Sequence, residues 1–126
     1  MKSISFFLVL AAFLLLFSQP SAEARTEEEV NNYLNQTIIP DFQSNTTAAD
    51  ALAILQKQLS LNRWGIYYDL ANKGKLQKTA VKIHLSNVSG MQVIAAICAA
   101  ANVKFVIKKD QIRIFEPWMV QQGYNP

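Results

Sequence analysis

Apolar and polar positions follow the same order twice along this chain. A polar cluster at residues 44–47 precedes apolar residues spaced three or four apart, and a second cluster at residues 86–89 precedes a similar set. The clusters lie 42 positions apart, and the apolar spacing that follows each one predicts an amphipathic helix. The apolar positions of the first helix are Ala48, Ala51, Leu52, Leu55 and Leu59. The pattern therefore predicts two strand–helix–strand halves that pack as one domain.

Both predicted helices begin at a capping residue. The hydroxyl of Thr47 can accept a hydrogen bond from an amide of the first turn, and Asp50 favours the positive end of the helix. Ser89 and Gln92 have the spacing of a capping box. The second helix, residues 91–101, is apolar almost all round and is expected to be the more buried of the two. Capping accounts for these polar side chains, so they are not candidates for a functional site.

β-prone segments flank both helices. The predicted strands are residues 37–45, 66–69, 81–86, 103–107 and 112–115. Pro40 removes one ladder donor from the first strand, which favours an edge or irregular position. Lys109 and Asp110 form a hairpin turn between the last two strands, and residues 71–75 form a polar loop with a glycine turn signal. We expect an α+β fold of two βαβ-like halves, with two helices packed on small mixed sheets.

The repeat is imperfect in its strands. An offset of 42 positions places Phe42 opposite His84, whereas the inward-facing position is Leu85. Either a bulge shifts one strand by a residue, or the similarity is limited to the helix and its cap. The first half is also a few residues longer between its helix and the following strand.

The first 24 residues have the pattern of a secretory signal peptide. Lys2 gives a positive start, residues 4–17 are apolar apart from one serine, and Ala22-Glu23-Ala24 fits the cleavage rule. The apolar run is shorter than the ~20 residues of a membrane span. We expect cleavage, export and no stable membrane span afterwards; an uncleaved anchor is the alternative.

The remainder of the chain divides into three parts. Residues 25–36 are expected to be a linker or a short, weakly held helix, residues 37–116 the folded domain, and residues 117–126 a C-terminal tail. Removing residues 1–24 from the 126 of the chain leaves 102 residues, which is enough for one domain.

The inventory of reactive side chains is small. The chain has one cysteine, one histidine and a net charge of +3. Cys98 lies in an apolar stretch and is expected to be a buried small hydrophobe, and His84 lies on the outward face of its strand. The spacing supports neither a zinc site nor a catalytic set of nucleophile and base. The sequence thus predicts no catalytic residue, no metal and no cofactor, and a protein that is not an enzyme.

Aromatic and basic residues of the first half are the remaining candidates for function. The candidate partner-binding residues are Trp64, Tyr67, Tyr68, Lys73, Lys75 and Lys78. Aromatic residues are frequent at the energetic centres of protein interfaces. The alternative is that Trp64 and one tyrosine pack on the helices while the lysines are solvated. A nucleic-acid partner is not expected for an exported protein.

Several segments resemble a known family. Ile39-Pro40-Asp41-Phe42, residues 47–55 and residues 66–69 resemble the first half of the secretin and TonB N-terminus short domain. Residues 81–89 with the following helix, and residues 103–115, resemble its second half. The resemblance implies a periplasmic module that contacts other proteins through helix faces or strand edges, without catalysis.

The leading hypothesis is therefore an exported periplasmic interaction module, related to secretin or TonB-dependent transport or signalling. Its partner would be another periplasmic or outer-membrane protein, and strand addition at a sheet edge is the expected mode. A homo-oligomer is one alternative. Another is a small-ligand-binding protein or hydrolase-like enzyme, with a pocket between the sheet and the helices lined by His84 and two carboxylates.

Overall fold

The computed structural model describes residues 25–126, and the expected signal peptide lies outside these residues. Mixed helices and strands form along this part of the chain, which confirms the α+β class. The elements are α2 (Glu27–Gln36), β1 (Ile38–Thr47), α3 (Ala48–Gln58), β2 (Tyr67–Leu70), α4 (Lys73–Lys78), β3 (Ala80–Ser89), α5 (Gly90–Ala100), β4 (Lys104–Lys108), β5 (Gln111–Phe115) and α6 (Pro117–Gln121).

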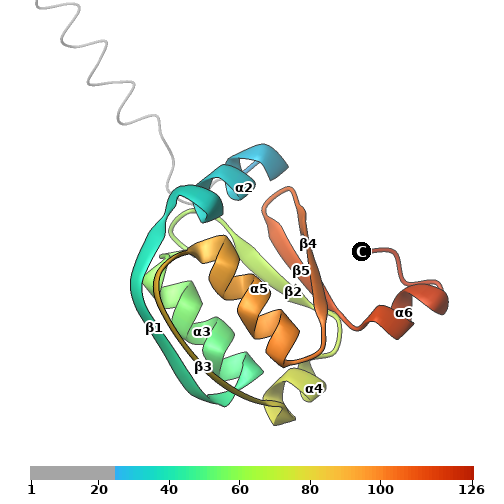
Figure 1. Cartoon of the computed structure of the whole chain (residues 1–126). Coiled ribbons are helices and arrows are strands. Elements are labelled where there is room, and N and C mark those ends of the chain that lie inside the picture. Colours follow the sequence, from blue (N-terminus) through green and yellow to red (C-terminus); the bar gives the residue numbers. More distant parts are fainter. Residues whose placement is uncertain (1–24) are drawn as a thin grey trace, which may run out of the picture.

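Two small sheets share one layer of helices. β1 and β3 pair antiparallel as a two-stranded ribbon, and the second sheet has the order β2-β5-β4. β2 runs parallel to β5, whereas β4 runs antiparallel to it. Figure 1 shows the ribbon along one side of α3 and α5 and the three-stranded sheet behind them. The two strands of each half therefore lie in different sheets, with the helix of that half between them.

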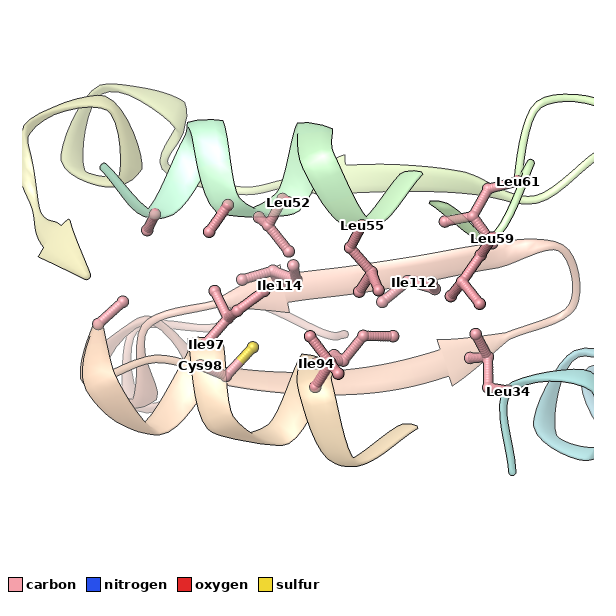
Figure 2. Packing of buried hydrophobic residues seen from close by; sticks show 14 of the residues in the cluster. Leu34, Leu52, Leu55, Leu59, Leu61, Ile94, Ile97, Cys98, Ile112 and Ile114 are labelled. Carbon is pink, nitrogen blue, oxygen red and sulfur yellow. The ribbon is translucent and has the colours of Figure 1, made fainter. Parts of the chain in front are cut away.

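The core lies where α3 and α5 face each other and the three-stranded sheet. Figure 2 shows leucines of α3 and isoleucines of α5 directed toward one another and toward β5. Fully or almost fully buried members of this cluster include Leu52, Leu55, Ile94, Ile97, Ile112 and Ile114. Each such side chain contributes about 1.5–3 kcal/mol through removal from water. This shared apolar layer holds both sheets.

The repeat is a property of the structure as well as of the sequence. β1 and β3 each have ten residues, α3 and α5 each have eleven, and equivalent positions are 42 residues apart. Both helices end the same way, with Ser60 and Asn102 in the left-handed region at φ 52° and 58°. The next strands start 37 positions apart, at Tyr67 and Lys104. Residues 62–66 of the first half consequently have no counterpart in the second.

A break in the ribbon explains the mismatch between the two copies. The ladder pairs Ile39 with Val88 and then Asp41 with Ser86, but it omits Pro40 and Asn87 between them. Asn87 has φ 55°, a conformation that asparagine adopts more readily than most residues. The break falls at the third position of β1 and at the eighth of β3. The irregular position expected at the proline is confirmed. The pairs on both sides of the break keep one register, so neither strand has an extra residue. The shifted strand faces follow from the different positions of the break in β1 and β3.

The inward faces of the ribbon change at this break. In β1 the buried side chains are Ile39, Phe42 and Ser44, so three positions separate the first two and two separate the next. A regular strand keeps an interval of two. The same ribbon can therefore cover the helices on both sides of the break, although its strands are irregular near one end.

Two segments are more ordered than the sequence indicated. The sequence predicts a loop over residues 71–75, but Lys73–Lys78 form α4, capped by the side chain of Asn72 and anchored by buried Leu76. Residues 25–36 contain α2, whose Val30 and Leu34 are fully buried, so this helix is not weakly held.

The C-terminal residues also contain a helix. α6 starts at Pro117, which is favourable at the first position of a helix because no N–H is needed there. Beyond α6, the ring of Tyr124 lies 5.6 Å from that of Phe115, centroid to centroid, and this contact returns the chain to β5.

The second helix of the repeat, α5, is only slightly more buried than the first. Five residues are buried in α5 and four in α3.

Gly90 is the point at which α2, α3 and α5 meet. A Cβ atom there would lie 2.9 Å from Cδ1 of Leu59 and 3.3 Å from the carbonyl oxygen of Leu34. We expect Gly90→Ala to lower the free energy of unfolding by about 1–3 kcal/mol through overpacking. Gly74→Ala is the matched control, because its Cβ would meet only Asn72 Oδ1, at 3.8 Å. This control should be stabilising by about 0.5–1 kcal/mol.

Urea unfolding of both variants measures the difference. Equal stability of the two alanine variants would contradict the close packing inferred at Gly90.

Candidate functional site

A groove forms where the extra residues 62–66 of the first half meet α2. It has a volume of about 290 Å³. We call it the Trp64 groove, and its lining residues are Arg25, Glu29, Asn32, Tyr33, Gln36, Trp64 and Ile66. Its walls therefore come from the N-terminal helix on one side and from the part of the chain that breaks the repeat on the other.

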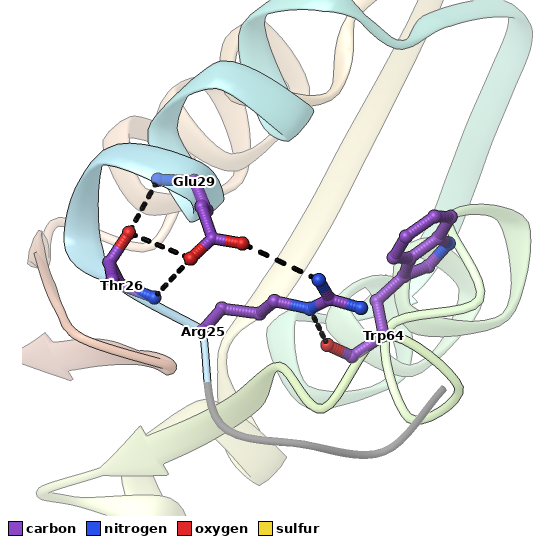
Figure 3. Close-up of polar contacts among 4 residues, drawn as sticks. All are labelled: Arg25, Thr26, Glu29 and Trp64. Atoms are coloured by element: carbon purple, nitrogen blue, oxygen red, sulfur yellow. Dashed lines mark hydrogen bonds and ion pairs between the residues drawn. The ribbon is translucent and has the colours of Figure 1, made fainter. Parts of the chain in front are cut away.

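Arg25 and Trp64 make the central contact of the groove. The guanidinium carbon of Arg25 lies 5.0 Å from the centroid of the Trp64 ring, within the range of a cation–π interaction. Arg25 Nε donates a hydrogen bond to the carbonyl oxygen of Trp64 at 3.1 Å, and its Nη1 lies 3.4 Å from Glu29 Oε2 (Figure 3). The cation thus contacts an aromatic face, a carbonyl oxygen and a carboxylate.

Neighbouring groups fix both walls of the groove. The Tyr33 ring lies 5.1 Å from that of Trp64, centroid to centroid, and its hydroxyl donates to the carbonyl oxygen of Leu59. Partial burial raises the pKa of Tyr33, so this hydroxyl keeps its proton at neutral pH. Hydrogen bonds from Thr26, and then the cation of Arg25, lower the pKa of Glu29. The groove therefore holds a carboxylate anion beside two aromatic rings.

The three aromatic candidates take different positions. Trp64 is 41% exposed in the groove, and Tyr67 is 45% exposed at the start of β2. Tyr68 instead donates its hydroxyl to the carbonyl oxygen of Leu52 at 2.8 Å, and burial raises its pKa. Tyr68 therefore packs on α3, in agreement with the alternative that one of the two tyrosines packs on the helices.

β2 is an edge strand, because the sheet order is β2-β5-β4.

The candidate lysines do not join the groove. Lys73 and Lys78 are exposed on α4, and Figure 1 places α4 and α2 at opposite ends of the molecule. Lys75 is engaged in the fold, because its Nζ lies 2.9 Å from Glu116 Oε1. The residues predicted as one partner-binding surface are thus divided between two ends of β2.

Sequence reasoning missed Arg25, Glu29 and Tyr33 as members of the site. The sequence interpretation of residues 25–36 as a linker or a short, weakly held helix overlooks that Thr26 and Glu29 have the spacing of a capping box. The structure contains that capping box, and Val30 and Leu34 of the same helix are buried. The box was the available signal for a helix, but the contact with Trp64 joins residues 39 positions apart and has no local signature.

His84 lies on the outer face of the ribbon, as predicted. Its Nε2 lies 2.7 Å from Asp41 Oδ1, and both side chains are more than half exposed. The hypothesis of a pocket between sheet and helices placed His84 in that pocket with two carboxylates. The layer between α3, α5 and the three-stranded sheet is instead occupied by apolar side chains (Figure 2). Within residues 25–126, no group of three potential ligands among His, Cys, Asp and Glu could hold a metal ion.

No family model, curated protein or solved structure matches this chain. In the part of the chain that the structure describes, no helix has both the length and the apolar character needed to cross a membrane.

Glu116 joins the end of β5 to α4 and has a lowered pKa. Its carboxylate pairs with Lys75 and accepts a hydrogen bond from Asn72 Nδ2 at 2.7 Å, and these contacts, Lys75 first, hold its pKa below 4.5. The ionised group therefore stabilises the fold above about pH 4.5, and this contribution is lost as the pH falls through the folded-state pKa.

We expect Glu116→Gln to be less stable than the wild type at neutral pH, with a difference that shrinks below pH 4.5. Lys75→Met removes the main cause of the lowered Glu116 pKa. The stability of this variant should therefore also change less with pH than that of the wild type. Urea unfolding at neutral and acidic pH measures both. A stability difference that does not change with pH would contradict this role of the carboxylate.

Cys98 is buried, as predicted, and burial raises its pKa to about 12. Because the thiolate is the reactive form, we expect the native protein to resist iodoacetamide at neutral pH and the urea-unfolded protein to react fully. Mass spectrometry of both samples counts the modified thiols. Labelling of the native protein at the rate of the unfolded one would show that Cys98 is accessible and reactive.

Proposed function

We propose that the mature chain is an exported, non-enzymatic module that binds another protein through the Trp64 groove and the adjoining edge strand β2. The observation that carries this proposal is the meeting of the Trp64 and Tyr33 rings in one groove. Trp and Tyr are among the residue types most enriched at the energetic centres of protein interfaces. Trp64 comes from residues 62–66, which have no counterpart in the second half of the repeat.

The edge of β2 supports the same surface. Tyr67 N–H donates to the carbonyl oxygen of Asp110, and Ala71 N–H donates to that of Ile114. These residues therefore pair with β5, and alternation along the strand directs the backbone groups of Tyr68 and Leu70 to the other side. An extended segment of a partner could pair with those groups, with Trp64 and exposed Tyr67 beside it.

The cellular setting of this proposal rests on the sequence. The signal-peptide pattern of residues 1–24 favours export, and the resemblance to the secretin and TonB N-terminus short domain favours the periplasm. The partner would accordingly be a periplasmic or outer-membrane protein of a transport or signalling system. In such a system the module would act as an adaptor.

The two tryptophans provide a matched test. Trp64 is 41% exposed in the groove and Trp118 is 48% exposed on α6, so either can be removed at a similar cost to packing. We expect Trp64→Ala to weaken capture of a partner from host cell-envelope extract by at least tenfold, since interface centres contribute about 2 kcal/mol or more. Trp118→Ala should bind as the wild type does. Quantitative pull-down with the immobilised mature chain measures both.

Thermal unfolding of both variants checks that the fold is kept. Tyr67→Asp tests the β2 edge separately and should also reduce capture. Equal recovery by Trp64→Ala and the wild type would exclude the groove as the contact surface. Light scattering of the purified chain measures its oligomeric state. An oligomer would identify a second copy of the chain as the partner, and a monomer would indicate a different protein.

A further inference from the structure

We infer that the Trp64 groove is a guanidinium-binding site, which Arg25 occupies within the same chain and which an arginine of the partner takes in the complex. This inference rests on the proposed function and names the chemistry of the partner. It starts from the fact that the groove already holds a guanidinium group, in contact with an aromatic ring, a carbonyl oxygen and a carboxylate.

The acceptors of the groove match a planar cation. The Trp64 ring lies against the guanidinium at 5.0 Å, the Trp64 carbonyl oxygen accepts from Nε at 3.1 Å, and Glu29 Oε2 lies 3.4 Å from Nη1. A guanidinium can stack on a ring while its N–H groups donate in two directions. A lysine ammonium is a compact, strongly hydrated charge that cannot stack in this way. The groove should therefore prefer arginine to lysine.

The acceptors are held in place by groups other than Arg25. Glu29 Oε1 accepts hydrogen bonds from the Thr26 backbone N–H at 3.2 Å and from the Thr26 hydroxyl at 3.0 Å, so the box orients Oε2 toward the groove (Figure 3). The Trp64 ring packs on Tyr33, whose hydroxyl is bonded to Leu59. A site that is organised before binding loses less entropy when a ligand enters. The groove would keep its shape if another arginine replaced Arg25.

Arg25 is placed so that exchange is feasible. It precedes Thr26, the N-cap of α2, and lies outside the helices and strands. Its ion pair joins side chains that are 23% and 52% exposed, and pairs of this kind contribute little net stability in water. A partner arginine that makes the same contacts, with a second contact along β2, would displace it.

The test uses Trp64 fluorescence and a defined probe. Trp118→Phe leaves Trp64 as the only tryptophan, because the chain has two. In this background, Arg25→Ala should bind N-acetyl-argininamide in a saturable manner, at least fivefold more tightly than the protein that keeps Arg25. N-acetyl-lysinamide at the same ionic strength should bind at least fivefold more weakly than the arginine probe.

Glu29→Gln is the control for charge. Glutamine can still form the capping box, so circular dichroism should show α2 intact while affinity for the arginine probe falls at least threefold. Equal binding of the arginine and lysine probes, or affinity that does not depend on Arg25, would overturn the inference.

The partner experiment separates this inference from the function on which it rests. We expect N-acetyl-argininamide to compete with captured partner and Arg25→Ala to raise capture at least fivefold. Capture that requires Trp64 but is insensitive to the probe and to Arg25→Ala would overturn the arginine assignment and leave the interaction module standing. If N-acetyl-argininamide binds but Trp64→Ala leaves partner capture unchanged, the proposed function is overturned instead.

Discussion

The shared helical layer is the constraint on which the rest of this structure depends. A two-stranded ribbon is marginally stable by itself in water, and a short three-stranded sheet needs a buried face. Here α3 and α5 supply that face to both sheets, through residues such as Leu55 and Ile97. The repeated cap and the repeated left-handed helix end place the two helices in equivalent positions, so each half brings one strand to each sheet.

The groove arises where this symmetry fails. Residues 62–66 lengthen the turn after α3, and the corresponding turn after α5 passes directly into β4. The longer turn places Trp64 beside α2, which is held against α5 at Gly90, a position with no room for a side chain. The repeated parts thus build the scaffold, and the unrepeated turn builds the concave surface where it meets the N-terminal helix.

Local chemistry made much of the fold predictable from sequence. The caps at Thr47 and Ser89 and the hairpin at Lys109 depend on neighbouring residues, so their signals were in the sequence. The site was harder to predict than the fold, because tertiary packing decides which side chains point outward. Tyr67 and Tyr68 are adjacent and chemically identical. Tyr68 is covered and Tyr67 is not, because the packing of β2 on α3 turns the Tyr68 side chain inward. The contact between Arg25 and Trp64 likewise depends on two segments that no local pattern connects.

The break at Pro40 and Asn87 has a consequence for solubility. Each strand of a two-stranded ribbon has one side without a neighbouring strand, and such edges can recruit strands of other molecules into aggregates. At the break the ladder is interrupted and the buried face of β1 shifts by one position. A regular strand from a second molecule would match the side chains on one side of the break and be out of phase on the other. The irregularity therefore shortens the edge along which uncontrolled association could spread.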